Sequence, residues 1–223
     1  MPRPSRNLDR ALLAAGRALL PARGCAGLSI REVADVANVN LGMFHYHFKT
    51  REAFLRTLLQ SMYEEMFSNL TLQHDESWSA VGNLRAALRF MGRFVRSNRP
   101  ILARVLADAL CGDEIAREFL RQNTHRHLGH MQALIELGQK EGTLKPMPVP
   151  QALGFCAGSL AMPILFGGAV AESGALGKAG TRMLAEALLS DAAIEERIEM
   201  AVAAISNDPA AARGKIAKRG KKK

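Results

Sequence analysis

The sequence predicts an all-α fold, on three observations. Apolar residues recur at helical spacing along almost the whole chain. Residues typical of strands do not gather in alternating runs. Capping residues, prolines and glycines divide the chain into about nine helices joined by turns. With 223 residues, 48% hydrophobic and 23% charged, the chain has enough apolar material for a substantial core.

Positive charge gathers at the two ends of the chain. Residues 1–60 hold nine Lys or Arg against four Asp or Glu, and residues 213–223 hold seven basic residues and no acidic one. The segment between them is mildly acidic. A basic N-terminal segment on a non-basic body favours contact with a polyanion, although a solvated surface would have the same composition.

The first helix is expected to follow a Pro/Arg-rich arm over residues 1–7 and to end at Pro21 and Gly24. Its apolar stripe comprises Leu8, Leu12, Ala15 and Leu19. Arg3 and Arg6 of the arm could contact phosphate or enter a minor groove, and a flexible solubilising tail explains them equally well.

The second helix has the clearest start signal in the chain. Ser29 followed by Glu32 predicts a capping box, in which each side chain satisfies a backbone donor. Leu28 and Val33 flank the cap as a hydrophobic staple. Arg31 is then left facing outward.

A third, short helix follows after a tight turn. Asn40 is expected to cap it, and Phe44 and Phe48 are expected to anchor it in the core. Thr50 then caps a long fourth helix. The side chains left on the exposed or half-exposed faces of the third helix are Leu41, Met43, His45, Tyr46 and His47. Tyr and His rings hydrogen-bond phosphates and base edges and pack on sugars, so this pair of helices indicates a helix-turn-helix that binds DNA.

A longer pattern runs through the same region. It comprises Gly24, Leu28-Ser29-Ile30, Val33-Ala34, the run from Val39 to Phe48, and Thr50-Arg51-Glu52. With these residues, positions 8–59 resemble the N-terminal domain of the tetracycline-repressor (TetR) family of bacterial transcription regulators. The chain departs from the family pattern at Asn40 (usually Ser or Thr), Met43 (Thr), His45 (Tyr) and Arg51 (Lys).

The resemblance implies which side chains contact DNA. They are Ser29, Arg31, Asn40, Leu41, Met43, His45, Tyr46, His47 and Arg51. Ser29 would donate to a phosphate as well as cap its helix, and Arg51 would hold a phosphate at the start of the fourth helix. Because Met43 and His45 lie on the reading face, the operator sequence cannot be taken from relatives.

The resemblance also implies a domain organisation. Residues 1–7 would be a basic arm, 8–56 the DNA-binding domain, 57–209 a ligand-binding and dimerisation domain, and 210–223 a disordered basic tail that either adds non-specific DNA affinity or is inert. In the family the last two long helices pair with those of a second subunit. The apolar stripe suited to this pairing is Ile194, Ile198, Val202 and Ile205.

The effector cavity is not readable from the sequence. Residues that could line it, or simply form helical core, are Phe90, Met91, Phe94, Leu106, Phe119, Met131, Phe155, Met162 and Phe166. The stretch from Pro146 to Ala171 holds no charged residue and is long enough to span a bilayer. Its prolines and glycines, with a kink expected at Pro163, favour a buried interface helix instead.

Histidines and cysteines offer alternative sites. His127 and His130 share a helix face and could be half of a metal site, but no matched partner lies nearby, so surface histidines explain them better and no metal or cofactor is expected. Cys25, Cys111 and Cys156 are widely spaced and odd in number. With no apolar signal segment at the N-terminus, we expect a reduced, cytoplasmic protein.

An enzyme and a helical adaptor are the alternatives to a DNA-binding regulator. An enzyme would need a nucleophile motif, a phosphate loop or paired carboxylates, and none is found. A helical adaptor without DNA binding does not explain the reading face. The sequence therefore predicts a ligand-responsive regulator, most simply a repressor that binds a pseudo-palindromic operator as a homodimer and is released by a small, largely apolar molecule.

Overall fold

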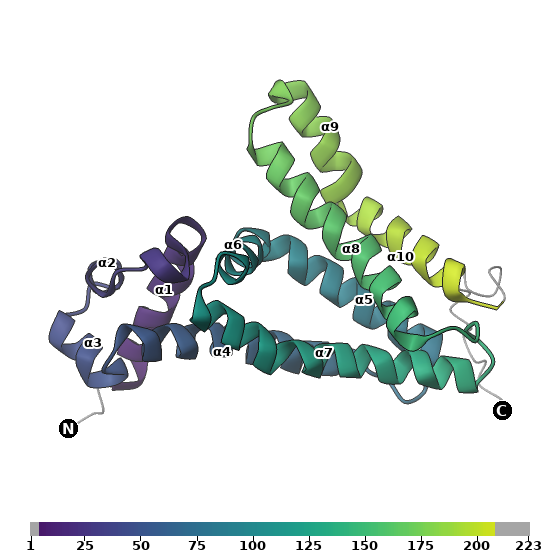
Figure 1. The fold of residues 1–223 in the computed structure, drawn as a ribbon, viewed down its shortest axis with the longest axis horizontal. Helices are drawn as coiled ribbons and strands as arrows, with labels where there is room; N and C mark the ends of the chain where they lie inside the picture. The colour runs from purple at the N-terminus through teal and green to yellow at the C-terminus, as the bar shows by residue number, and fades with distance from the viewer. Residues whose placement is uncertain (1–4, 208–223) are drawn as a thin grey trace, which may run out of the picture. The chain divides into compact units, whose positions relative to one another are not determined.

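The computed structural model describes residues 5–207, and its regular elements in this range are all α-helices (Figure 1). There are ten of them, against about nine expected. They are α1 (Ser5–Gly27), α2 (Ile30–Val36), α3 (Leu41–Phe48), α4 (Arg51–Thr71), α5 (Ala80–Ser97), α6 (Arg99–Leu110), α7 (Glu114–Lys140), α8 (Val149–Glu172), α9 (Gly177–Leu189) and α10 (Asp191–Ile205). The predicted basic tail, and Arg3 of the predicted arm, lie outside the described residues.

The helices form two compact units. The first consists of residues 5–69 and 98–127, and the second of residues 70–97 and 128–207. The first unit therefore joins the predicted helix-turn-helix with most of α4, with α6 and with the first half of α7. The domain boundary expected after residue 56 falls inside the first compact unit. The division of functions at that residue stays a prediction.

Three phenylalanine rings form the centre of the first unit. Phe44 and Phe48 of α3 pack on Phe54 of α4, with ring centroids 5.1 and 4.9 Å from it, and Phe44 and Phe54 are fully buried. Burying a side chain of this size stabilises a fold by about 1.5–3 kcal/mol. Gly16 of α1 permits the close packing, because a Cβ atom there would lie 2.6 Å from the Phe54 ring. The two anchors predicted for the third helix are thus confirmed.

The corner between α1 and α2 turns at Gly24, whose φ of 67° and ψ of −180° interrupt the helical path. Such a positive φ is accessible to glycine without strain. Of the two stop signals predicted for the first helix, Gly24 is confirmed, whereas the helix continues through Pro21. A side chain on Gly24 would also collide with the guanidinium of Arg104 on α6.

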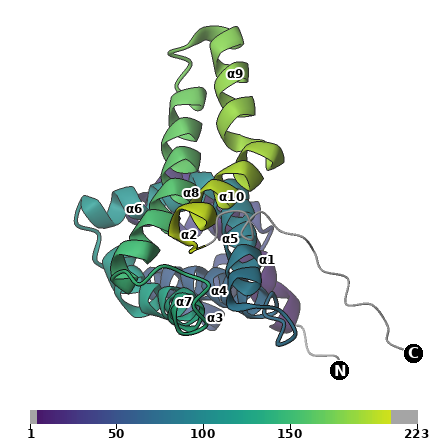
Figure 2. The same cartoon turned by 90° about the vertical axis from the view of Figure 1, so that its right-hand side faces the viewer.

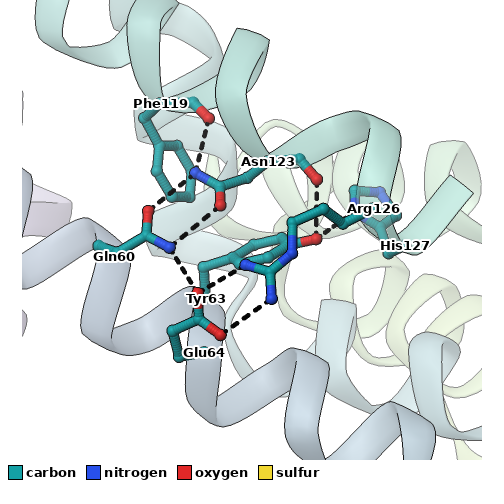
Figure 3. Close-up of polar contacts among 7 residues, drawn as sticks. All are labelled: Gln60, Tyr63, Glu64, Phe119, Asn123, Arg126 and His127. Atoms are coloured by element: carbon teal, nitrogen blue, oxygen red, sulfur yellow. Dashed lines mark hydrogen bonds and ion pairs between the residues drawn. The ribbon is translucent and has the colours of Figure 1, made fainter.

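Polar side chains join α4 to α7 within the first unit (Figure 3). Gln60 and Asn123 exchange hydrogen bonds of 3.0 and 3.2 Å through their amides. The Tyr63 hydroxyl donates to the Asn123 carbonyl at 2.7 Å. Arg126 pairs with the Glu64 carboxylate at 2.6 Å and lies over the Tyr63 ring, 5.2 Å from its centroid. These contacts fix the register of the two helices.

The second unit is built from α5, the second half of α7, and α8 to α10. Its core includes the apolar stripe of α10, where Ile194, Ile198, Val202 and Ile205 are each at most 2% exposed. They pack within their own chain, where α10 contacts α5 and α8. The expectation that this stripe faces a second subunit is wrong, because it is already covered. Ion pairs such as Arg85–Glu199, at 3.0 Å, border this packing.

Helix α9 is not predicted by the sequence, because Gly174, Gly177 and Gly180 lie close together and indicate a break. The first two glycines do turn the chain, with φ of 73° and 62°. The chain then folds back as α9, which packs beside α8 (Figures 1 and 2). Gly180 lies inside the helix.

Within residues 5–207, α8 is the helix long and apolar enough to cross a membrane, with a mean hydropathy of 1.8 over its most apolar window. Only 28% of that window is buried inside the chain. The predicted burial of α8 is therefore incomplete in a single copy. Its exposed apolar residues are Phe155, Met162, Phe166 and Val170.

Candidate nucleic-acid interface

The start of α2 differs from the predicted capping box. Ser29 occupies the N-cap position, but its side chain forms no capping hydrogen bond. Glu32 pairs instead with Arg23, whose Nη2 lies 2.7 Å from the carboxylate. This pairing lowers the pKa of the Glu32 carboxyl and raises that of the Arg23 guanidinium. The Ser29 hydroxyl is exposed and available to a phosphate, as is the exposed side chain of Arg31.

Helix α3 begins as predicted at Asn40, whose Oδ1 accepts a hydrogen bond of 2.7 Å from the backbone N–H of Gly42. The cap satisfies one of the donors that the first turn leaves unpaired. Leu41 and Met43 are half-buried, and Leu41 packs against the core of the unit. The start of this helix is therefore fixed by both polar and apolar contacts.

The outer face of α3 carries polar rings. Tyr46 is the most exposed of them, with 73% of its surface accessible. His45 is exposed as well, and its Nδ1 lies 3.1 Å from the Lys49 carbonyl. His47 is half-buried beside the Tyr46 ring, and its Nε2 is buried without a hydrogen-bond partner. Tyr46 and His45 thus present hydrogen-bonding atoms outward, while His47 lies at the edge of the helix packing.

Arg51 is placed differently from what the resemblance implies. Its guanidinium donates to the carbonyl oxygens of Cys25, Ala26 and Leu28, at 2.7 Å for Ala26 and 2.8 Å for Leu28. These carbonyls belong to the chain between Gly24 and α2. The first residue of α4 therefore supports the turn that leads into α2, and a phosphate contact by Arg51 stays a prediction.

Lys49 was passed over by the sequence analysis. It is exposed, lies between the last residue of α3 and the Thr50 cap of α4, and has a positive φ of 60°. Thr50 caps α4 as predicted, since its Oγ1 accepts a hydrogen bond of 3.1 Å from the Ala53 N–H. The signal for Lys49 in the sequence was its position: a lysine in a tight turn beside the reading face.

These features define a short helix suited to a groove in DNA. With eight residues and a rise of about 1.5 Å per residue, α3 is about 12 Å long, and an α-helix, about 10–12 Å across with its side chains, fits a major groove about 12 Å wide. Its inner side is fixed by Phe44 and Phe48, and its outer side carries donors and acceptors. Ser29, Arg31 and Lys49 border it with groups that bind phosphate.

Residues 12–58 match the family model described as bacterial regulatory proteins of the tetR family. This segment is a TetR-family DNA-binding domain. The match spans α2, α3, most of α1 and the first part of α4, and so confirms the resemblance seen in the sequence. Regulators of this family act by binding DNA rather than by catalysis.

The remainder of the chain shares its fold with solved TetR-family structures. A regulator from Shewanella sp. PV-4 has 17% identity and a TM-score of 0.64, covering 91% of this chain and 100% of the other. FadR of Bacillus subtilis, solved with stearoyl-CoA, has 16% identity, a TM-score of 0.62, and coverages of 82% and 98%. The ketosteroid regulator KstR2 of Mycobacterium tuberculosis has 14% identity, a TM-score of 0.64, and coverages of 93% and 98%. Among curated proteins, none matches the chain.

The other candidate sites have less support from the structure. Within the described residues, no group of three or more His, Cys, Asp or Glu side chains is placed to hold a metal ion. His127 is hydrogen-bonded to Tyr63 at 3.3 Å, and the His130 ring meets His74 edge-on. His127 and His130 are thus both engaged in contacts with other parts of the chain.

The apolar residues considered for an effector cavity do not form one common lining. Met131 is buried in the core, whereas Leu106, Phe155, Met162 and Phe166 are exposed. A groove of about 560 Å³ does run along α4 and α7 in the first unit. Its lining residues are Arg56, Thr57, Gln60, Ser61, Glu64, Ile115, Glu118, Phe119 and Gln122. Most of these residues are polar or charged, but the surface that they present to the groove is mainly apolar, so their residue types do not exclude a largely apolar ligand.

Proposed function

We propose that the protein is a ligand-responsive transcriptional repressor that binds a pseudo-palindromic operator as a homodimer. The observation that carries the proposal is α3, which exposes Tyr46 and His45 on a helix anchored by Phe44 and Phe48. Polar residues outside and apolar residues inside are usual for a surface helix, so the supporting feature is the chemistry of the exposed rings, whose hydroxyl and imidazole groups suit base edges and phosphates. DNA is the partner that the family match favours.

The proposed DNA contacts divide into two kinds. Tyr46, His45, Met43 and Asn40 would face base edges and sugars, with the Met43 thioether suited to a thymine methyl. Ser29 and Arg31 would bind phosphates and set the position of the helix without reading sequence. Leu41, His47 and Arg51 remain in the proposed set. Their half-buried placement suits edge contacts or support of the reading face.

A second copy of the chain is the proposed partner of α8 and α9. One side of this pair is apolar and uncovered, with Phe166 63% and Met183 70% exposed. Phe155, Met162, Phe166 and Val170 are seven, four and four residues apart, so they share one face of α8. A patch of this kind marks an interface, and the family resemblance favours a second copy over a membrane. The proposed site of action is accordingly the cytoplasm.

Dimerisation also follows from the size of the reading helix. One helix about 12 Å long spans only a few base pairs. Two copies related by a two-fold axis read two half-sites, which gives a palindromic site and the affinity that a single domain lacks. Repression is the proposed mode because it is the commoner mode in the family.

The proposed effector is a small, largely apolar molecule. FadR with stearoyl-CoA and a ketosteroid regulator share this fold, which supports an apolar ligand for this chain. A ligand that binds one conformation of the dimer better than the other would change the spacing of the two reading helices. Coupling of about 1–3 kcal/mol is typical of such systems and changes DNA affinity by about 5–150-fold.

A gel-shift assay on the DNA upstream of the protein's own coding sequence tests the proposal. The wild type should give a discrete complex that resists competitor DNA, and Tyr46→Ala should lose it. Trp78→Ala is the matched control, because Trp78 is an aromatic residue 51% exposed in the second unit. Selection from random duplexes should return a palindromic site. Weak, equal binding by all three proteins and no selected sequence would refute a sequence reader and favour the adaptor alternative.

A further inference from the structure

The backbone at Lys49 has a conformation that a lysine rarely adopts. Its φ is 60° and its ψ is −57°, and the N–H of Thr50 donates to the Phe48 carbonyl at 2.6 Å. A hydrogen bond that spans one residue with these angles is a γ-turn of positive φ, which is rare and strained. Glycine accepts such angles without a Cβ penalty.

The turn is needed, but a lysine side chain is not needed to make it. The Lys49 N–H donates to the His45 carbonyl at 3.1 Å and ends α3, and Thr50 immediately caps α4. The first contact uses the Lys49 backbone and the second uses the Thr50 hydroxyl, so neither needs the Lys49 side chain, and glycine at position 49 would allow both with less strain. Strain of this kind tends to occur where the side chain has a function.

The charged group of Lys49 is also available to bind an anion. Within the described residues it forms no ion pair, and its side chain is exposed. Arg51, two residues later, is bound to three carbonyl oxygens and lies 3.5 Å from the Glu52 carboxylate. Of the two basic residues in this turn, Lys49 is therefore the one with an unengaged cation. It stands at the end of the reading helix, where the 21-residue helix α4 also begins.

We propose that Lys49 binds a DNA phosphate next to the reading helix, while Arg51 acts as a positioning residue for the turn before α2. The proposal rests on the proposed function and adds that Lys49, in place of Arg51, makes the phosphate contact. The contact is independent of sequence, since a lysine ammonium binds a phosphate as a point charge.

The test separates charge from backbone strain with three variants. Lys49→Gly removes the charge and relieves the strain, Lys49→Arg keeps the charge, and Asn38→Gly relieves the other positive φ of a non-glycine residue, 52°, without changing charge. Thermal unfolding and DNA affinity are measured for each between 50 and 200 mM salt. The DNA is the duplex that the wild type selects from random sequence, and a scrambled duplex of equal length.

Lys49→Gly should raise Tm by about 2–4 °C and yet weaken binding to both duplexes. The slope of log affinity against log salt should become shallower by about 0.9 for each Lys49 that contacts a phosphate. Lys49→Arg should restore the wild-type slope, and Asn38→Gly should gain stability with an unchanged slope. Lys140→Ala, in the second unit, controls for loss of one exposed charge and should also leave the slope unchanged.

An unchanged affinity and slope in Lys49→Gly would overturn the proposal, as would an equal change in Lys140→Ala. Either result leaves the proposed function intact as long as the wild type selects a DNA sequence. If the wild type selects no DNA sequence, the proposed function itself is refuted. Failure of the Lys49 proposal and failure of the proposed function are therefore distinguishable.

Discussion

The Oδ2 atom of Asp108 accepts a buried hydrogen bond from the backbone N–H of Cys25, with 2.7 Å between the two atoms. The same carboxylate accepts from Arg104 at 2.9 Å, and Arg104 reaches back to the Arg23 carbonyl at 3.3 Å. Helix α6 thereby holds the turn that follows Gly24. The guanidinium of Arg51 on α4 holds the same turn by donating hydrogen bonds to the carbonyl groups of the turn.

Asp108→Ala should destabilise the protein by about 2–3 kcal/mol, because a buried donor loses a charged acceptor and Arg104 loses its partner. Thermal or urea unfolding measures the loss. Asp35→Ala removes an exposed carboxylate from α2 and should change stability by less than about 0.5 kcal/mol. Equal stabilities of the two variants would mean that the Asp108–Cys25 bond contributes nothing.

Arg51→Lys should cost about 1–2 kcal/mol although the charge is kept, because an ammonium cannot reach three carbonyl groups in the way a planar guanidinium does. Amide hydrogen exchange of residues 25–28 should accelerate in the same variant. Arg10→Lys, at an exposed position of α1, serves as the control. Unchanged exchange in Arg51→Lys would show that the guanidinium does not support the turn.

Thiol labelling should distinguish the three cysteines. Burial, together with the nearby Asp113 and Asp108 carboxylates, raises the pKa of the Cys25 thiol to about 12. Burial alone raises that of Cys156 to about 11. Both thiols therefore stay protonated at pH 8, whereas Cys111 is exposed. A maleimide should label one thiol rapidly in the folded protein, and Cys111→Ser should abolish that phase; rapid labelling that persists in Cys111→Ser would contradict the burial of the other two.

Stability should fall on acidification below about pH 6.5, partly through His127. Burial lowers the pKa of this imidazole in the folded state below its unfolded value of 6.5. The unfolded chain then binds the proton more readily. The contribution of His127 to stability is complete above pH 6.5 and is lost as the pH falls through the lowered pKa.

His127→Gln should flatten this dependence, measured as Tm against pH from 7 to 5. Some slope should remain, because burial, aided by the nearby His74, also lowers the pKa of His130. His125→Gln changes an exposed neighbour on α7 and should flatten the slope only slightly, because the charge of His125 makes the smallest of the contributions to the lowered pKa of His127. An identical slope in His127→Gln would remove His127 from the explanation.

Phe166→Glu should dissociate the proposed homodimer, because it places a charge in the centre of the exposed apolar face of α8. Light scattering at graded concentrations should show a dimer dissociation constant raised about thirtyfold or more. Leu72→Glu alters an equally exposed apolar residue off this face, 77% accessible, and should leave the dimer intact. A wild type that is monomeric at micromolar concentration would contradict the dimer altogether.

The helix-turn-helix was predictable because its signals are local. Asn40 caps α3 from two residues away, and Phe44 and Phe48 are spaced to face one side. The features that were missed depend on residues distant in sequence. Glu32 forms an ion pair with Arg23 instead of a capping box with Ser29. Arg51 donates hydrogen bonds to carbonyl groups that lie near it because the helical path is interrupted at Gly24.

The second unit shows the same limit. Helical periodicity identified an apolar stripe on α10 but could not say what covers it, and the answer is α5 and α8 of the same chain. Three closely spaced glycines concealed α9, because Gly174 precedes the helix, Gly177 begins it with a positive φ, and Gly180 lies within it.

The turn between Gly24 and α2 is held by its buried Cys25 and Leu28 side chains and also through its main chain, because Arg51 and Asp108 bind its carbonyl and N–H groups. Main-chain groups are common to all residues. Exposed turn positions such as Ala26 can thus drift during evolution without loosening the attachment. Selection instead acts on the distant side chains, and relatives that carry the usual lysine of the family in place of Arg51 must hold this turn through other contacts.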